Sequence, residues 1–357
     1  MTSNTLTRGS TYSLLADLPL LVNGYRLAGL AKPWSSSFTR RSTVVHLFGG
    51  QEEGVGEDVT YTPDDHELFQ RQGGHLPLAG AFTLREFSEL LDEYDLFSRP
   101  PERDDSRAHR RWAFESAALD LALRQSRLSL ADALRLSPKP VEFVVSFRLD
   151  DDAPSIDPVA ERLALYPSMR FKIDTSSSWS TELIAELEAT GAVASVDFKG
   201  HYEGLPVAIS VDAEISARVI TGLPTAWLED PALTAETESL LGSSWGRVTW
   251  DAPIRSVADI TSLARKPVMV NVKPSRFGRL EALLDAYDHL AYEGIGAYGG
   301  GQFELGPGRG QIQYLASLFH PTAPNDVAPV VHHEIRAGLP TSPLEPALEP
   351  IGFRIVE

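Results

Sequence analysis

Short apolar runs alternate with amphipathic stretches along the chain from about residue 141 onward. Runs rich in β-branched residues predict buried strands, and apolar residues at three- and four-residue steps predict helices. The predicted strands cover 141–147, 169–174, 192–198, 225–230, 247–251, 267–273 and 294–300, with a weak eighth before Asn325 and Asp326. Because a helical stretch fits between successive strands, the pattern favours a closed parallel (β/α)8 TIM-like barrel over an open doubly wound sheet.

The first part of the chain follows another pattern. Residues from about 10 to 62 are rich in β-like runs with glycines between them. Helical patterns follow, with a capping-box match at Thr83 and Glu86 and the clearest helix over 107–125.

This change of pattern predicts how the chain divides. We expect an α+β capping domain, then the barrel, then a proline-rich tail that returns to the capping domain. The expected boundaries are 1–138, 139–335 and 336–357.

Charge and composition exclude several classes of protein. The formal net charge of −17 disfavours nucleic acid and anionic membranes, because both would be repelled. The absence of cysteine excludes disulfides and thiolate chemistry. Since no stretch approaches the ~18 apolar residues of a membrane span and the first residues lack an apolar signal region, we expect a cytoplasmic protein.

Three acidic residues each close a short β-like run and precede a loop: Asp197, Glu229 and Asp251. In a parallel barrel the carboxyl ends of neighbouring strands meet at one rim, where barrel enzymes place their chemistry. Carboxylates that converge there would repel one another without a cation. The sequence therefore predicts a site for a hard ion, Mg2+ first and Mn2+ as a substitute.

Lys273 ends another predicted strand and is the best candidate for a group that transfers protons. An amine close to Mg2+ and other cations has a lowered pKa, so its free form can accept a proton from carbon.

Several motifs, in this order along the chain, resemble those of the enolase superfamily. They are GVGEDV, FESAALDLALRQ, LEDP, WDAPIRSVADI, NVKPSRFG, GGGQFELGPGRG and PIGF. The chain resembles the branch of the mandelate racemase/muconate-lactonizing enzyme family that contains muconate-lactonizing enzyme and o-succinylbenzoate synthase. The resemblance implies a capped barrel in which Asp197, Glu229 and Asp251 bind Mg2+.

The resemblance also implies an activity. Such enzymes abstract a proton α to a carboxylate and stabilise the enediolate on the metal, which gives racemisation or epimerisation, cycloisomerisation or dehydration of a small carboxylate. It implies that Arg276, Glu304 and Asp326 contact substrate or orient a lysine. It also implies that mobile loops of the capping lobe set specificity, and these would be 30–41 and the acidic stretch after Tyr61. The expected partner is a small-molecule carboxylate substrate. Whether the chain forms a homo-oligomer stays an open question at this point.

The chain departs from the family at two positions. Relatives carry K-x-K on the second strand, whereas this chain has Lys172 and then Asp174; relatives carry D-x-N on the third strand, whereas Lys199 follows Asp197 here. Alternation along a strand places Lys172 and Asp174 on one inward face. We hypothesise that Asp174 and Lys199 form a swapped pair, in which Lys199 takes over the acid/base work of the missing lysine.

An alternative stays open at this point. The same pair would also suit an enolase-fold protein that keeps the metal site but has lost catalysis, and that acts in binding or regulation.

Overall fold

Seven parallel strands form the larger sheet, and their order in space follows their order in the chain. The computed structural model describes residues 10–33, 39–201 and 212–356. The strands are β6 (Val145–Arg148), β7 (Phe171–Asp174), β8 (Val193–Asp197), β9 (Trp227–Glu229), β10 (Val248–Trp250), β11 (Met269–Val272) and β12 (Gly296–Gly299). Each of the seven lies within the corresponding stretch predicted from the sequence or extends one residue past it.

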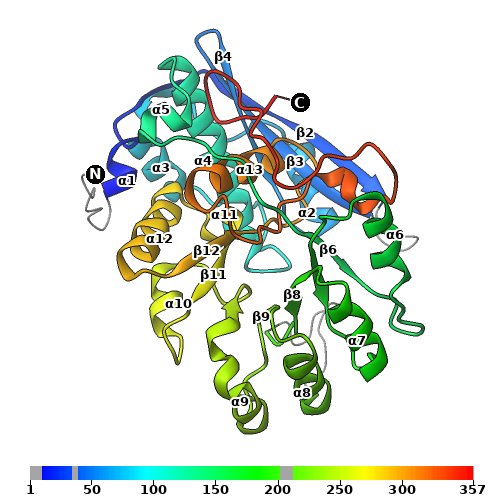
Figure 1. The fold of residues 1–357 in the computed structure, drawn as a ribbon. Coiled ribbons are helices and arrows are strands. Elements are labelled where there is room, and N and C mark those ends of the chain that lie inside the picture. The colour runs from blue at the N-terminus through cyan, green and yellow to red at the C-terminus, as the bar shows by residue number, and fades with distance from the viewer. Residues whose placement is uncertain (1–9, 34–38, 202–211, 357) are drawn as a thin grey trace.

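Helices connect successive strands and lie around the outside of the curled sheet (Figure 1). Between β6 and β12 they are α6 (Asp157–Leu165), α7 (Thr181–Ala189), α8 (Ala213–Gly222), α9 (Ala235–Leu241), η2 (Gly242–Arg247), α10 (Val257–Ser262), α11 (Pro274–Phe277) and α12 (Leu280–Glu293). After β12 follow α13 (Pro307–Phe319) and η3 (Val330–His333). The outer side of the sheet, which faces these helices, is apolar, and residues such as Phe171, Val196 and Leu228 are buried there. The inner side carries buried polar residues, among them Lys172 and Thr249.

The expected eighth strand is not a regular strand in the described structure. Asn325 instead makes an isolated parallel bridge with Phe143, and Asp326 makes one with Gly300. These bridges join the two outer edges of the seven-stranded sheet. Proline lacks the N–H that a ladder needs, so the prolines of PTAPNDVAP explain why the pairing stays this short.

The side chain of Asn325 reinforces this closure. Its Oδ1 accepts hydrogen bonds from Gly299 N and His320 Nδ1, each at 2.7 Å, and its Nδ2 donates to Glu142 O at 2.8 Å. Since Nδ1 of His320 donates, its Nε2 accepts from the Tyr287 hydroxyl at 3.0 Å. His320 is therefore neutral, and its burial lowers the pKa to about 4.

A separate antiparallel sheet forms the capping lobe, in the order β2 (Gly24–Pro33), β3 (Thr39–Gly49) and β4 (Glu52–Asp58). A small sheet pairs β1 (Pro19–Val22) with β5 (Gly80–Thr83). The helices of the lobe are α1 (Ser10–Ser13), α2 (Pro63–Gln72), α3 (Leu84–Leu90), η1 (Leu91–Glu93), α4 (Ser106–Gln125) and α5 (Leu130–Leu134). The capping box at Thr83 and Glu86 is present.

The glycines of GVGEDV let α4 approach β4 closely. A Cβ at Gly54 would lie 2.2 Å from the Ala117 carbonyl oxygen, and one at Gly56 would lie 2.1 Å from the Ala113 carbonyl oxygen. Only a residue without a side chain fits such contacts. The motif thus sets the distance between sheet and helix.

Two loop predictions for the capping lobe were wrong. Most of 30–41 belongs to the β2–β3 hairpin, although 34–38 lie outside the described residues. The acidic stretch after Tyr61 forms α2, with Pro63 at its first turn. This part of the hairpin was missed because its strands are stabilised by pairing with each other. The irregular apolar pattern of 30–41 does not indicate such pairing.

Two buried side chains join the capping lobe to the barrel. The Arg40 guanidinium donates to the carbonyl oxygens of Val59 and Thr60, both at 2.7 Å, and of Gln302 at 2.9 Å. The Glu57 carboxylate accepts from backbone N–H groups of residues 305, 306 and 308 at the start of α13. The charge of Arg40 is therefore used to hold carbonyl groups of both parts together.

The C-terminal tail returns to the capping lobe (Figure 1). Asp120 of α4 accepts hydrogen bonds from Phe353 N at 2.8 Å and from Arg354 Nε at 2.6 Å. Among the described residues, no helix is both long enough and apolar enough to cross a membrane.

We predict that His320 makes the fold sensitive to acid. The pKa of this side chain is 6.5 in the unfolded chain and about 4 in the folded one, so between these values only the unfolded chain binds the proton. The free energy of unfolding should therefore fall as the pH drops from 6.5 to 4, by up to ~3 kcal/mol from this residue. Urea denaturation at several pH values measures this free energy of unfolding.

The variant His320→Gln should be less stable at pH 7 but should lose less stability on acidification. The exposed His75→Gln change is the control and should keep the wild-type pH dependence. An unchanged pH dependence in His320→Gln would contradict the prediction.

Candidate active site

The polar residues predicted at the strand ends come together at one end of the larger sheet. In the strand register Asp174 lies opposite Asp197, and Asp197 lies opposite Glu229. Asp251 and Lys273 directly follow β10 and β11. The carboxyl ends of parallel strands share one edge, which is why separate segments deliver these side chains to one place.

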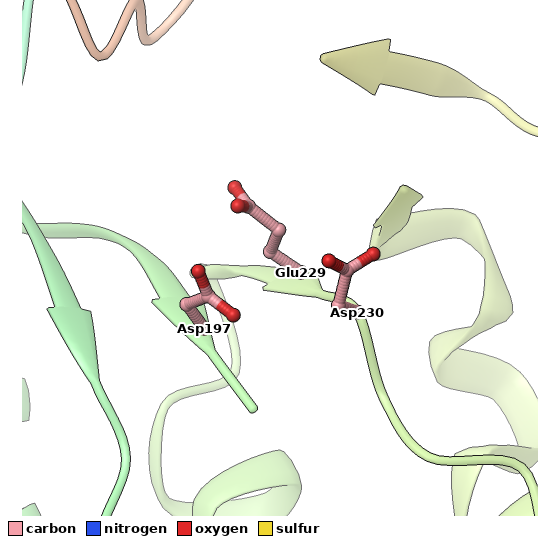
Figure 2. A group of neighbouring side chains, drawn as sticks. All are labelled: Asp197, Glu229 and Asp230. Atoms are coloured by element: carbon pink, nitrogen blue, oxygen red, sulfur yellow. The ribbon is translucent and has the colours of Figure 1, made fainter. Parts of the chain in front are cut away.

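Three carboxylates lie close enough to share one metal ion: Asp197, Glu229 and Asp230 (Figure 2). One oxygen from each lies within 4.8 Å of the others, and all three residues are buried. The third member differs from the predicted Asp251. Glu229 pairs in register with Thr249, so Asp251 lies two residues further toward the rim than Glu229.

Asp230 owes its place to an unusual backbone conformation. Its φ angle is +48°, in the left-handed region that aspartate tolerates better than most residues. Its two carboxylate oxygens accept hydrogen bonds from Asp251 N and Ala252 N, both at 2.8 Å. Burial, together with the nearby Asp251 and Asp197 carboxylates, raises the pKa of Asp230 to about 7.

Asp251 is held by two cations. Lys273 Nζ lies 2.8 Å from Oδ2, and Arg276 Nη1 lies 2.7 Å from Oδ1. Although burial opposes its charge, Arg276 and Lys273 keep the pKa of Asp251 well below the usual range. Asp251 is therefore an ionised carboxylate at the rim, and it fixes Lys273 and Arg276 there.

Lys172 lies between the acids of three other segments. Its Nζ pairs with Glu229 and lies 3.3 Å from Asp197 Oδ2 and 3.5 Å from Asp326 Oδ2. Burial alone would lower the pKa of Lys172, but Glu229 and Asp197 outweigh it and raise the pKa well above the ordinary value. Lys172 therefore stays an ammonium ion.

The structure also brings Lys199 and Asp174 together. Lys199 Nζ lies 3.2 Å from Asp174 Oδ1 and also pairs with Asp197. The Lys199 backbone has a φ of +51°, and its N–H donates to Asp197 Oδ1 at 2.9 Å. This turn directs the side chain back over the end of β8. Lys199 and Lys172 together hold the pKa of Asp197 at about 2 despite burial.

Glu304 lies in a different environment. Its Oε1 accepts a hydrogen bond from Gln302 N at 2.6 Å, and its Oε2 lies 3.1 Å from Arg309 Nη2. These contacts fix the loop after β12, beneath the capping lobe. Asp326, by contrast, reaches the charged cluster through Lys172.

Sequence reasoning missed Tyr298. This buried residue of β12 donates its hydroxyl to Glu229 Oε2 at 2.6 Å, while Lys172 holds the other oxygen of the same carboxylate. A large polar ring in the glycine-rich run GIGAYGG was the available signal. Tyr298 thus fixes the orientation of a candidate metal ligand from across the barrel.

The donor set fits a hard divalent cation. Six carboxylates meet at this end of the sheet, namely Asp174, Asp197, Glu229, Asp230, Asp251 and Asp326, whereas the cations paired with them are Lys172, Lys199, Lys273 and Arg276. Full ionisation would leave an excess of two negative charges. Carboxylate oxygens are the ligands that Mg2+ prefers, and one such ion would neutralise that excess.

Two family models match the chain. One is described as "Domain of unknown function (DUF8230) N-terminal domain" and covers residues 13–133; the other is the corresponding C-terminal domain and covers residues 137–334. No curated protein matches the sequence.

Solved structures share the fold at low sequence identity. An unknown member of the enolase superfamily from Enterococcus faecalis V583 matches with a TM-score of 0.66 and 18% identity, over 87% of this chain and 86% of that one. A probable mandelate racemase from Alicyclobacillus acidocaldarius matches with a TM-score of 0.65 and 21% identity, over 86% of each chain. The muconate cycloisomerase of Pseudomonas fluorescens gives 0.61 and 16%, over 87% of each.

We predict that Tyr298→Phe weakens Mg2+ binding by about 10- to 100-fold, because the Glu229 carboxylate loses the hydroxyl that orients it. Calorimetric titration with Mg2+, repeated with Mn2+, measures the change. The control is Tyr166→Phe. It removes a hydroxyl that donates to Arg336 O, on a residue that precedes β7, away from the carboxyl ends of the strands. Equal affinities in wild type and Tyr298→Phe would show that the hydroxyl does not support the metal site.

Proposed function

Because the chain belongs to the DUF8230 family and has the fold of the enolase superfamily, we propose that it is a Mg2+-dependent isomerase or lyase. Its reaction removes a proton α to the carboxylate of a small acid. The observation that carries this proposal is the meeting of buried carboxylates with a buried amine, Lys273, at the carboxyl ends of the strands. The match to racemase and cycloisomerase structures supports it.

Asp197 and Glu229 would hold the metal ion, with a third oxygen from Asp230 or Asp251. When bound, Mg2+ would stabilise the negative charge that develops on the substrate carboxylate as the α proton leaves. Lys172 adds a fixed positive charge beside the same oxygens. These groups favour an anionic substrate even though the chain as a whole is acidic.

Lys273 would act as the base. Its burial lowers the pKa of the ammonium group, Arg276 and Lys172 lower it further, and Asp251 opposes them. A lysine with a lowered pKa has a larger share of free amine, which can take the α proton. Lys172 is unsuited to that step because its pKa is raised. The two lysines therefore have different roles, one electrostatic and one in proton transfer.

Lys199 would return a proton on the opposite face of the substrate, with Asp174 orienting its side chain. The α carbon loses its proton to Lys273 and gains one from Lys199, which gives the epimer. Without the second transfer, the same first step leads to cycloisomerisation or to loss of water. This pair supports racemisation or epimerisation as the outcome.

A second candidate function is binding or regulation without turnover. The observation that favours it is the replacement of the second-strand lysine of relatives by Asp174, together with the engagement of Lys199 by both Asp174 and Asp197. A lysine held by two carboxylates is well suited to a structural ion pair.

We predict that Lys273→Ala lowers exchange of the α proton with solvent deuterium by about 10²- to 10⁴-fold. Lys199→Ala should abolish inversion at the α carbon but retain exchange on one face. NMR and chiral chromatography follow both, with a panel of N-acyl amino acids, dipeptides and succinylbenzoate precursors.

The control variant is Lys266→Ala, which removes an exposed lysine paired with Glu293 and should behave as wild type. Inversion that survives Lys199→Ala would contradict the role of Lys199. Metal binding without exchange on any substrate would favour the second candidate function.

A further inference from the structure

His109, in the first turn of α4, is buried between the capping lobe and the barrel, with only 1% of its surface exposed. Within the described part of the chain, neither of its ring nitrogens has a hydrogen-bond partner. Buried polar groups without a partner are uncommon because each loses its bonds to water. The imidazole thus has unmet hydrogen-bonding capacity.

Another buried histidine shows what a structural role looks like in this protein. His66 is also fully buried, but its Nδ1 bonds to Thr43 Oγ1 at 2.9 Å and its Nε2 bonds to Thr60 O at 2.7 Å. The fold therefore satisfies the polar atoms of His66 and leaves those of His109 open. The His109 nitrogens are therefore open to a partner from outside the described chain, such as a bound ligand.

His109 lies next to the candidate active site. A Cβ on Gly278 would lie 3.1 Å from Ala108 Cα, so the end of α11 touches α4 at the residue before His109. The same short helix contains Arg276, which holds Asp251 and acts on the charge of His109. The imidazole is therefore placed on the capping side of the residues at the rim.

Tyr61 forms the other side of this region. Its ring meets that of His109 edge to face, with centroids 6.2 Å apart. Its hydroxyl donates to Gln302 Oε1 at 2.7 Å, and Arg40 lies over its ring at 4.8 Å. Tyr61 is thus fixed in position, and Gln302 comes from the loop that follows β12.

We propose that His109 is a substrate-contacting residue that determines specificity. With Tyr61 it would form a subsite for an uncharged group that both donates and accepts hydrogen bonds, such as an amide, at the end of the substrate remote from its carboxylate. This inference rests on the proposed function only for the location of that carboxylate, beside Lys273 and the metal ligands.

The chemistry of the subsite follows from its charge. Burial lowers the pKa of His109 to about 4, so the ring is neutral and offers one donor and one acceptor. The nearby carboxylates of Asp105 and Asp58 raise the pKa of the ring, whereas Arg276 and Arg40 lower it. A second carboxylate on the substrate would lose its water here without gaining a cation as partner. An amide, in contrast, could donate one hydrogen bond to the ring and accept one from it.

Three probes of similar shape test the subsite: succinamate, succinate and 4-oxopentanoate. They share one carboxylate and differ at the other end, which is an amide, a carboxylate or a methyl ketone. NMR titration with Mg2+ present gives their affinities, and the longer series glutaramate, glutarate and 5-oxohexanoate covers a deeper subsite. We expect the amide to bind at least ~10-fold more tightly than the ketone or the dicarboxylate.

His109→Phe keeps a ring against Tyr61 but removes both nitrogens. The ratio of the affinity for the amide to that for the ketone should therefore fall to about 1. His109→Gln keeps a donor and an acceptor and should retain the preference. No preference in the wild type at either length, no binding by any probe, or an unchanged preference in His109→Phe would each overturn the proposal.

A thermal unfolding measurement separates a binding role from a structural one. His109→Phe should leave Tm unchanged or raise it, because no hydrogen bond is lost, whereas His66→Phe should lower Tm by several degrees. A fall in Tm for His109→Phe as large as that for His66→Phe would overturn the proposal. Deuterium exchange tests the proposed function independently, since discrimination between probes requires no turnover.

Discussion

Mutual compensation among buried charges at the carboxyl end of the barrel is the constraint on which the rest of this structure depends. Asp197, Glu229, Asp230 and Asp251 have no exposed surface. Carboxylates in such an environment cannot all stay ionised unless cations lie among them. Lys172 supplies one such charge at the centre of the cluster. Each cation in the network stabilises the ionised carboxylates around it, and removal of one partner would leave an uncompensated buried charge.

The same network gives its lysines different properties. Lys172 contacts three carboxylates and holds its proton more tightly, whereas Lys273 pairs with a carboxylate that it shares with Arg276 and holds its proton less tightly. Relative to the pattern of the family that the chain resembles, Asp174 stands where relatives have a lysine and Lys199 stands where they have an asparagine. A lysine is therefore kept near the site on the neighbouring strand, and the new acid pairs with it, so these two positions together carry one positive charge less.

The capping lobe encloses this charged region through buried contacts of its own. Arg40 and Glu57 bind backbone atoms of the segment between β12 and α13 instead of other side chains. Such contacts fix the lobe against the barrel whatever side chains that segment carries. Four carboxylates at the strand ends are fully buried, and this exclusion of water strengthens the electrostatic interactions among them. His109 and Tyr61 lie at this boundary, where the two parts of the molecule meet.

The sequence by itself determined the order of strands and helices in the barrel and the carboxylates at the strand ends, because apolar periodicity and position along a strand are local properties. It did not predict that the β2–β3 hairpin extends into 30–41, nor the closure by Asn325, nor the surroundings of Tyr298 and His109. Nor did it indicate that Asp230 would join Asp197 and Glu229. These features depend on the stagger between strands and on contacts between distant segments, so only the tertiary structure decided them.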